Sequence, residues 1–361
     1  MSLKLSALQV FAGSRARQHL LEHGLQARDV VAVPAAAGGP KGLILGPLDE
    51  YIFGPWLSAS SQTVHLLGAS IGAWRMATAC LRDAPREFER LAHEYLHQTY
   101  PHAPGKPPTA RDVSKGFASK LHEVFGGREQ EVLSHPRFRL HVFTSRGRHL
   151  MRREGRFSTP LGYLGAYASN VVRRRAMGAW LERVVFSDPR ERLPVATNDY
   201  KTHHALLSAE NFQPSILASC SIPFWLQAVH DIPGAPQGAY WDGGITDYHL
   251  HLNYASMAQP GLVLYPHFQA QVIPGWLDKA LKHRHRGTAF LDNVVLLTPS
   301  PEWVKSLPNA KLPDRQDFKF YGDDISARAA AWRTGIQASR ALADEFAALT
   351  QQASVNALPL N

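Results

Sequence analysis

Two apolar runs near the start of the chain are short, contain valine or leucine at most positions, and are each followed by glycine. Residues 30–33 lead to Gly38 and Gly39, and residues 64–67 lead to Gly68, after which residues 73–81 have the composition of a helix. Apolar runs of this length are typical of strands that are buried on both faces of a parallel sheet. Two such strand, turn and helix units in succession predict an α/β protein with a mostly parallel sheet.

Apolar residues recur with the periods of strands and helices along the rest of the chain. Further strands are predicted at residues 139–144, 184–186, 195–197, 262–265 and 294–297. Further helices are predicted at residues 85–100, 111–125, 208–218 and 327–349. The last of these helices either closes the domain or forms part of an extension.

The composition is that of an ordinary globular protein, since 361 residues with 45% apolar content can bury a large core. A formal charge of +9 favours anionic partners, such as a phospholipid surface or nucleic acid. The two cysteines, Cys80 and Cys220, are interpreted as small buried apolar residues. Residues 1–20 lack the apolar run of a secretion signal, and no segment has the roughly 20 apolar residues of a membrane span. We therefore expect a cytoplasmic protein, with peripheral contact to a membrane as an option.

The segment Gly68-Ala69-Ser70-Ile71-Gly72 lies between the second strand and its helix. This pattern is typical of a nucleophile elbow, in which a strained turn exposes a serine. The two glycines would also suit a strand-to-helix turn that needs them only for packing. The strand before the motif and the helix after it favour Ser70 as a nucleophile.

A serine nucleophile needs a base, and it needs hydrogen-bond donors for the oxyanion that forms on the substrate. Gly38 and Gly39 have no side chains, so their amides can approach a substrate oxygen. They could also form a plain tight turn or a phosphate loop, although the complete nucleotide-binding patterns are absent. Asp242 is the candidate base, because burial beside Trp241 would raise its pKa, but it could also be a simple Asp-Gly turn residue.

Three motifs, taken in order, resemble those of the patatin-like phospholipases. They are Ala37-Gly38-Gly39-Pro40-Lys41-Gly42, Gly68-Ala69-Ser70-Ile71-Gly72 and Asp242-Gly243-Gly244. The family carries a glycine-rich loop that ends in Arg/Lys-Gly, then Gly-x-Ser-x-Gly, then Asp-Gly-Gly or Asp-Gly-Ala. Residues 218–223 also resemble the segment before the family's aspartate, and residues 195–199 resemble the end of its central strand. The resemblance covers about residues 28–250.

The resemblance implies a three-layer α/β/α fold and a Ser70/Asp242 dyad that acts on acyl esters without a histidine. It implies an oxyanion hole made by the amides of Gly38 and Gly39, with no metal or organic cofactor. The supporting motif residues are Lys41, Gly42, Gly68, Gly72, Gly243 and Gly244. Ala36 and Ala37 stand where the family often has Asp-Gly or Gly-Gly, so the first amide of the loop is given no role.

The implied activity is that of a phospholipase A or lysophospholipase, and the implied substrate is an acyl-ester lipid, with phospholipid as the expected case. Residues 1–27 would be an N-terminal segment, residues 28–255 the patatin-like catalytic core, and residues 256–361 an extension that packs on the core. Contact with an anionic membrane is compatible with the basic charge. No nucleic-acid partner is expected, because no nucleic-acid-binding module is recognisable.

One competing pattern is His93-Glu94-Tyr95-Leu96-His97, which fits the zinc-protease signature. In that signature two histidines one helical turn apart bind the metal, and the glutamate activates water. The apolar positions of the helix predicted at residues 85–100 leave His93, Glu94 and His97 on the opposite face. A solvated polar face is the simpler interpretation.

Two further alternatives stay open. His249, His251 and His267 follow Asp242 in the order of an α/β-hydrolase triad, so a Ser/His/Asp mechanism is conceivable. The basic groups at residues 173–175 and 282–286 could contact lipid headgroups or nucleic acid, or could simply be solvated. A non-enzymatic membrane-surface or nucleic-acid-binding protein is therefore the alternative from another class.

Overall fold

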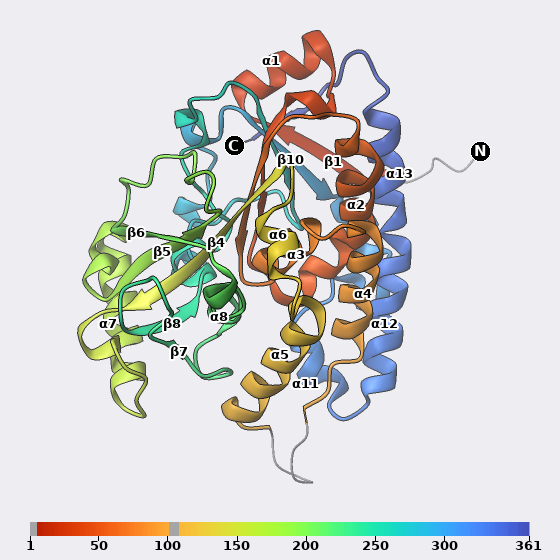
Figure 1. Cartoon of the computed structure of the whole chain (residues 1–361). Helices are drawn as coiled ribbons and strands as arrows, with labels where there is room; N and C mark the ends of the chain where they lie inside the picture. Colours follow the sequence, from red (N-terminus) through yellow and green to blue (C-terminus); the bar gives the residue numbers. More distant parts are fainter. Residues whose placement is uncertain (1–5, 101–107, 361) are drawn as a thin grey trace.

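The computed structural model describes residues 6–100 and 108–360, and its central feature is one eleven-stranded sheet (Figure 1). The strand order is β11-β1-β10-β9-β2-β3-β4-β5-β6, with β8 paired to β4 and β7 paired to β8. Six of the ten strand pairs are parallel, which confirms the predicted mostly parallel sheet. The strands are β1 (Leu8–Ala12), β2 (Val30–Ala35), β3 (Val64–Ala69), β4 (Phe138–Gly147), β5 (Leu181–Ser187), β6 (Thr202–Leu206), β7 (Val229–His230), β8 (Ala239–Asp242), β9 (Leu262–Pro266), β10 (Val294–Pro299) and β11 (Leu358–Pro359).

Helices flank this sheet, and the α/β class predicted from the sequence is confirmed. The α-helices are α1 (Ser14–His23), α2 (Gly46–Tyr51), α3 (Ile71–Ala79), α4 (Ala84–Leu96), α5 (Ala110–Phe125), α6 (Glu129–Leu133), α7 (Ser158–Val172), α8 (Ala209–Cys220), α9 (Gly244–Asp247), α10 (Pro301–Lys305), α11 (Gln316–Tyr321), α12 (Ile325–Ala338) and α13 (Arg340–Leu349). In Figure 1, α12 and α13 run along the right-hand side, where they contact α4 and α2.

Side chains on the strands alternate between two buried cores, one on each face of the sheet. On β3, for example, Leu66 belongs to the first core and Leu67 to the second. Large residues from α3, α4, α5 and α8 close the first core, whereas the second is closed mainly by loops and short 3-10 turns within residues 193–195 and 248–291. Burial on both faces explains why most residues of the central strands are apolar.

Most predicted elements are present, with ends that differ by a few residues. The strands predicted at 30–33, 64–67, 139–144, 184–186, 262–265 and 294–297 are β2, β3, β4, β5, β9 and β10. The helices predicted at 73–81, 85–100, 111–125 and 208–218 are α3, α4, α5 and α8. Strands β1, β6, β7, β8 and β11 were not predicted, because each has at most five residues and none contains more than three apolar residues in a row.

One predicted strand is wrong, and one predicted helix is present but divided in two. Residues 195–197 form only an isolated bridge, between Ala196 and Asn253, because Val195 packs into the second core without a neighbouring strand to pair with. The helix predicted at 327–349 is divided at Ser339, whose hydroxyl donates a hydrogen bond to the carbonyl of Ile336 and ends α12. Helix α13 then begins at Arg340.

Strands from all three sequence segments share the sheet. β1 lies within residues 1–27, of which residues 1–5 fall outside the described part of the chain, and β9, β10 and β11 lie within residues 256–361. β9 is inserted directly beside β2, the strand that leads to Gly38. The segment after residue 255 therefore contributes to the same sheet that carries the predicted site.

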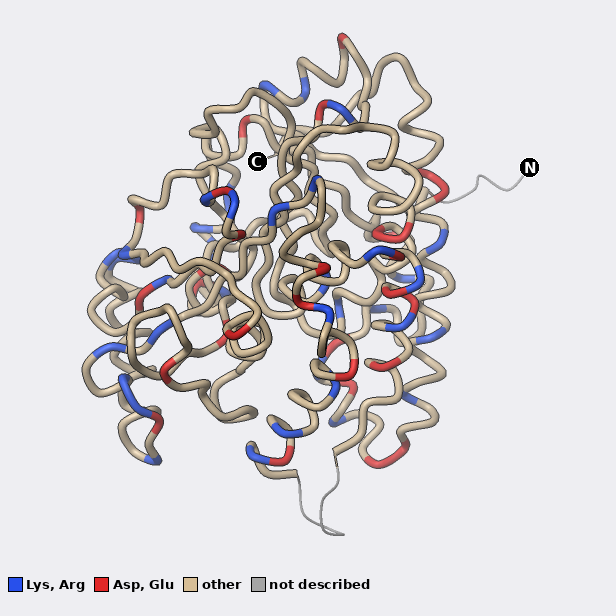
Figure 2. Tube along the Cα trace, in the orientation of Figure 1, with Lys and Arg blue, Asp and Glu red and all other residues tan. Residues whose placement is uncertain are grey.

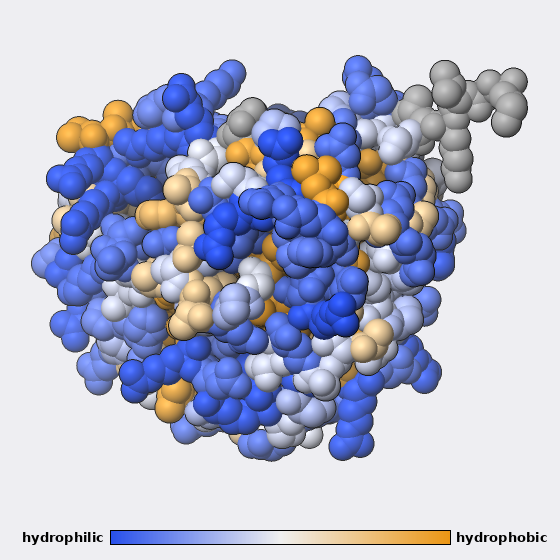
Figure 3. All heavy atoms as spheres, turned by 90° about the horizontal axis from the view of Figure 1, so that it is seen from above, coloured by the Kyte–Doolittle hydropathy of each residue, from blue (hydrophilic) through white to orange (hydrophobic). Residues whose placement is uncertain are grey.

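The surface carries basic residues over much of the chain, and Figure 2 shows Lys and Arg on most of the elements. The face seen from above in Figure 3 is largely hydrophilic, with its apolar spheres in separate small groups. Cys80 and Cys220 are buried and unpaired, as interpreted from the sequence. Within the described residues, none of the helices has the length and apolar composition that a bilayer crossing requires.

A buried ion pair joins the helix that follows the glycine loop to the helix that follows Ser70. Arg75 on α3 is 3% exposed and Asp49 on α2 is 0% exposed. The guanidinium donates two hydrogen bonds to the carboxylate, of 2.7 and 2.8 Å. This two-point contact fixes the position of the glycine loop relative to the turn at Ser70.

We expect Arg75→Met to lower the free energy of unfolding by about 3–5 kcal/mol, because Asp49 would remain buried without its partner. The double variant Arg75→Met/Asp49→Leu should recover much of this loss, since it removes both charges. Urea denaturation followed by circular dichroism measures both variants. Equal losses in the single and the double variant would contradict this account.

Candidate active site

Strands β3 and β8 meet end to end on one edge of β4. β3 runs parallel to β4, and its last residue, Ala69, lies opposite Phe143. β8 runs antiparallel to β4, and its last residue, Asp242, lies opposite Thr144. Since β5 occupies the other edge of β4 over residues 141–147, β3 and β8 must share this one. The topology therefore places Ser70, just beyond β3, next to Asp242.

The turn at Ser70 has the strained backbone of an elbow. Ser70 has φ 57° and ψ −129°, in the region that residues with a side chain rarely adopt, and it caps the N-terminus of α3. A Cβ atom at Gly68 would lie 2.4 Å from the Cα of Ala73, and one at Gly72 would lie 1.9 Å from the carbonyl oxygen of Ala35. Both glycines are thus needed for close approach of the backbone.

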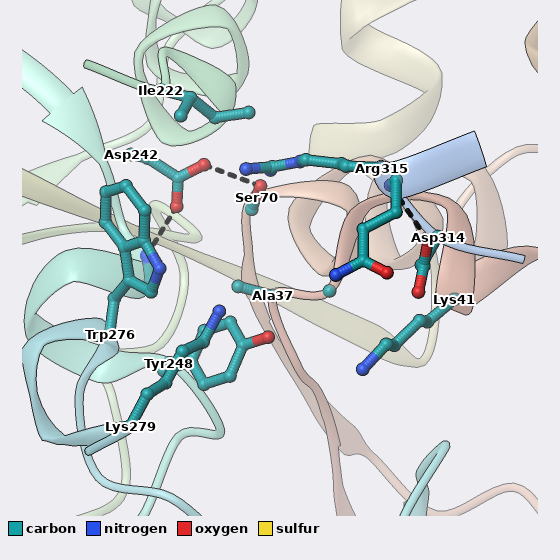
Figure 4. A pocket seen from close by; sticks show the side chains of 13 residues that line it. Ala37, Lys41, Ser70, Ile222, Asp242, Tyr248, Trp276, Lys279, Asp314 and Arg315 are labelled. Carbon is teal, nitrogen blue, oxygen red and sulfur yellow. Dashed lines mark hydrogen bonds between the residues drawn. The ribbon is translucent and has the colours of Figure 1, made fainter. Parts of the chain in front are cut away.

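Ser70 and Asp242 are directly hydrogen-bonded (Figure 4). The hydroxyl of Ser70 donates to Oδ2 of Asp242 at 2.7 Å, and the amide of Gly244 donates to Oδ1 at 2.7 Å. Asp242 is 6% exposed, and burial raises the pKa of its carboxyl. A carboxylate with a raised pKa accepts a proton more readily than an exposed one, so this pair can transfer the Ser70 proton to Asp242.

Ser219, near the end of α8, holds the turn at Ser70 in place. Its hydroxyl accepts a hydrogen bond from the amide of Ser70 at 2.9 Å and donates one to the carbonyl of Phe143 at 2.7 Å. Its own carbonyl accepts from the amide of Gly243 at 3.1 Å. A Cβ atom at Gly243 would lie 2.0 Å from the carbonyl oxygen of Phe143, so the glycine lets this junction close.

The glycine loop follows β2 and borders the same site. The amide of Ala37 donates to the carbonyl of Tyr248 at 2.9 Å, so this first amide of the loop serves the fold. Gly38 lines the cavity beside Ser70, and Gly39 is buried with φ 56°, which favours glycine. Within the described residues, no protein group accepts a hydrogen bond from the amide of Gly38 or Gly39. These two amides are therefore available as donors.

The other motif residues support this arrangement. Lys41 lines the cavity, and Gly42 lets the loop pack on α3, because a Cβ atom there would lie 3.3 Å from the side chain of Ile71. A Cβ atom at Gly244 would lie 2.6 Å from the Cβ of Ala37. The glycine loop and the segment after Asp242 are thus in close contact.

The cavity above Ser70 and Asp242 has a volume of about 190 Å³ (Figure 4). It is lined by Ala37, Gly38, Lys41, Ser70, Ile222, Asp242, Gly244, Tyr248, Trp276, Lys279, Asp314, Arg315 and Gln316. One part of its wall is apolar or aromatic, with Ile222, Tyr248 and Trp276. The other part is charged.

Three cations, Lys41, Lys279 and Arg315, converge on this cavity (Figure 4). Within the described residues none of them has a carboxylate at ion-pair distance, and the carboxylate of Asp314 is paired with Lys311 at 2.8 Å. Burial, together with Arg315 and Lys41, lowers the pKa of Lys279 to about 8. The cavity therefore has an excess of positive charge that an anionic group could balance.

The histidines proposed for a triad lie elsewhere. Within the described residues, no histidine is hydrogen-bonded to Ser70 or Asp242, and none lines the cavity. His249 and His267 form a buried ring contact with centroids 4.4 Å apart, and burial lowers both pKa values. His251 is also removed from the site, beside Thr288.

The two histidines of the zinc-protease pattern lie on the solvent side of α4 and at its C-terminal end, as expected from their helical spacing. His93 and His97 are exposed, and Glu94 forms an ion pair with Lys120 at 2.9 Å. In the described ranges, no group of three or more His, Cys, Asp or Glu side chains is arranged to hold a metal ion.

Parts of the two basic groups have structural roles that sequence reasoning did not reveal. Arg174 and Arg284 both pair with the buried carboxylate of Asp278, each at 2.9 Å. Asp278 lies two residues after Trp276, which lines the cavity. These arginines therefore fix one wall of the site. Arg173 and Arg175 are exposed.

Several residues of the site were not identified from the sequence, although one of them had a usable signal. Ser219 belongs to a segment that the family resemblance had singled out, so its Ser-Cys-Ser context was a usable signal. Lys279 and Arg315 come from the region after residue 255, which matched no motif. They enter the site only because β9 and β10 return this region to the sheet beside β2.

Comparisons with known proteins are sparse. No protein-family model matches the chain, and no curated protein matches it. Among solved structures it is similar to human GIVD cytosolic phospholipase A2, with a TM-score of 0.43 and 12% identity, over 93% of this chain and 62% of that chain. The chain thus spans less than two thirds of that protein.

Ser219→Ala should lower the free energy of unfolding by about 1–3 kcal/mol, because it leaves the amide of Ser70 and the carbonyl of Phe143 without a partner. Ser221→Ala is the matched control, since within the described residues the hydroxyl of Ser221, just after α8, bonds only to the carbonyl of Leu217 one turn earlier. Guanidinium denaturation of the two variants measures the difference. A loss no greater than that of the control would show that Ser219 does not hold the turn.

Proposed function

We propose that the protein is a serine acyl-ester hydrolase in which Ser70 is the nucleophile and Asp242 is its base. The observation that carries this proposal is the 2.7 Å hydrogen bond between the Ser70 hydroxyl and a buried carboxylate, on a strained turn between strand and helix. A conventional triad would need a histidine between the two. The order of motifs that resembles the patatin-like phospholipases supports the same dyad, and membership of that family is part of the proposal.

In the proposed reaction, the Ser70 oxygen attacks the ester carbonyl while its proton passes to Asp242. The amides of Gly38 and Gly39 donate hydrogen bonds to the oxyanion, each worth on the order of 3 kcal/mol of transition-state stabilisation. Collapse of the tetrahedral intermediate releases the alcohol, which takes the proton from Asp242, and leaves an acyl-enzyme. Asp242 then accepts a proton from water, the resulting hydroxide attacks the acyl group, and the carboxylic acid leaves as Ser70 is reprotonated.

The proposed substrate is an acyl-ester lipid with an anionic headgroup, such as a phospholipid or lysophospholipid. Lys41, Lys279 and Arg315 offer charge and hydrogen-bond donors for a phosphate. Ile222 and Trp276 offer an apolar wall for the acyl chain. We propose activity of the phospholipase A or lysophospholipase type, in the cytoplasm and at the surface of an anionic membrane, with no nucleic-acid partner.

Labelling with a fluorophosphonate probe tests the nucleophile. We expect wild type to be labelled at Ser70, no labelling of Ser70→Ala, and slow labelling of Asp242→Asn, because the amide cannot accept the proton. Turnover of a soluble acyl ester should fall by at least about 1,000-fold in both variants. His93→Ala and addition of a chelator are the controls, and neither should reduce labelling.

The result that would overturn the dyad is full ester turnover in folded Ser70→Ala. Folded wild type that takes up no probe and hydrolyses no ester would instead favour a non-enzymatic basic protein. Loss of labelling after addition of the chelator would instead support a zinc site at His93 and His97.

A second test concerns the charge of the substrate. Arg315→Gln and Lys279→Gln should each lower kcat/KM for an anionic acyl ester by about tenfold, since a hydrogen bond to a charged group contributes about 1.5–3 kcal/mol. A neutral ester of the same chain length should lose little. Lys305→Gln, at an exposed position of α10, is the control. Equal losses for the anionic and the neutral ester would show that these cations do not recognise the headgroup.

A further inference from the structure

Helix α7 (Ser158–Val172) is a surface helix without a single charged residue. Its sequence, STPLGYLGAYASNVV, contrasts with that of α4, APREFERLAHEYL, which is also a surface helix. In Figure 2 the body of α7, at the left, carries no charged colour, whereas the chain before and after it does. A surface helix that keeps no charge in 15 residues needs an explanation.

One face of α7 is packed tightly on the protein. The buried residues recur at helical spacing and are Thr159, Gly162, Tyr163, Ala166 and Asn170. Met151 fills the space at Gly162, and the Trp180 ring fills the space at Gly165. The side chain of Asn170 donates to Asp278 at 2.8 Å. These contacts hold one face of α7 against the protein, so the opposite face of the helix lies at the surface.

The outer face of α7 is apolar as well. Leu161 is 57% exposed, Leu164 is 64% exposed and Val172 is 84% exposed, and Phe157, just before the helix, is 80% exposed. Pro160, Tyr167, Ala168 and Val171 are also exposed on the helix. Isolated exposed leucines are ordinary, but a continuous apolar helix face marks a site of interaction.

The packed face of α7 connects the helix to the mouth of the candidate active site. The ring of Tyr163 on α7 contacts the ring of Phe224, with centroids 5.8 Å apart. Phe224 and Trp225 are 61% and 65% exposed, and they follow Ile222, which lines the cavity. α7 also contacts the short turn Trp276–Asp278, whose Trp276 lines the cavity from another side.

Arginines border the apolar face at both ends of α7. Arg152 and Arg156 precede the helix and Arg173 and Arg175 follow it; all four are exposed, and within the described residues none has a carboxylate at ion-pair distance. Of two nearby acids, Asp231 pairs with Arg153, whereas Glu154 keeps its charge and accepts a hydrogen bond from the amide of Ala228. With four unpaired arginines against Glu154, the net charge around the face is positive.

We propose that the outer face of α7, together with Phe224 and Trp225, inserts into the headgroup region of an anionic lipid bilayer and brings the cavity to its substrate. This inference deepens the proposed function, on which its link to catalysis rests. An apolar helix face with flanking arginines is the pattern by which helices lie in a membrane interface, with the apolar side about 5–10 Å deep.

A bilayer fits this surface better than a second copy of the chain does. Two α7 helices packed antiparallel would bring Arg152 and Arg156 of one copy against Arg173 and Arg175 of the other. These like charges would repel one another at both ends of the contact. Anionic headgroups, in contrast, would neutralise all four arginines while the leucines enter the bilayer.

The test is co-sedimentation of the full chain carrying Ser70→Ala with vesicles, so that hydrolysis cannot alter the lipid. We expect binding to vesicles of phosphatidylcholine mixed with phosphatidylserine, and much weaker binding to pure phosphatidylcholine. Leu161→Glu/Leu164→Glu should lower the apparent affinity at least about tenfold, and Arg173→Gln/Arg175→Gln about fivefold per arginine. The matched control is Leu21→Glu/Arg15→Gln on α1, where Leu21 is 47% exposed and Arg15 is also exposed.

Binding by the α7 variants as strong as that of the α1 control would overturn the proposal. So would a dimer in sedimentation velocity that the α7 variants dissociate, without any vesicle binding. If the leucine variant does not fold, as judged by circular dichroism, Trp225→Ser tests the same surface from a loop. Turnover of a soluble ester by α7 variants that retain Ser70 should be unchanged. Vesicle binding by a wild type that hydrolyses no ester would refute the hydrolase and leave this inference standing.

Discussion

The end-to-end meeting of β3 and β8 on one edge of β4 is the constraint on which the rest of the site depends. A parallel strand and an antiparallel strand both finish beside the peptide between Phe143 and Thr144. The residue after β3 and the last residue of β8 then have to be neighbours, although 172 positions separate them in the chain. The hydrogen bond between Ser70 and Asp242 thus follows from backbone pairing and does not depend on flexible loops.

This junction is possible only because several residues are small. Gly68, Gly72 and Gly243 each stand where a Cβ atom would lie within 2.4 Å of another part of the backbone. The hydroxyl of Ser219 fills the remaining gap, where it satisfies the amide of Ser70 and the carbonyl of Phe143. Buried backbone groups need such partners, so the fold and the candidate chemistry depend on the same few contacts.

The features that could be predicted from the sequence are those determined by residues close together in the chain. The elbow at Ser70 and the strands around it have short-range signatures, because glycine spacing and apolar runs reflect local backbone needs. The position of Asp242 was predicted from order and resemblance, and its contact with Ser70 needed the topology. Arg315 and Lys279 could not be predicted, since they reach the cavity through strands β9 and β10, which pair with residues far away in sequence. The strand predicted at residues 195–197 was wrong for the same reason, because strand pairing needs a neighbouring strand that the sequence of these residues does not specify.

Burial and the cations of the cavity act on the pKa of Asp242 in opposite directions, and this balance links the proposed substrate to the proposed chemistry. Burial raises the pKa of Asp242, whereas Arg315 and Lys279 lower it. The two cations therefore favour the ionised form of this carboxylate, whereas burial disfavours it. An anionic headgroup bound to Arg315 and Lys279 would offset their positive charge and raise the pKa of Asp242 again. The carboxylate would then become a stronger acceptor for the Ser70 proton once a charged lipid is in place, and a neutral ester would not produce this effect.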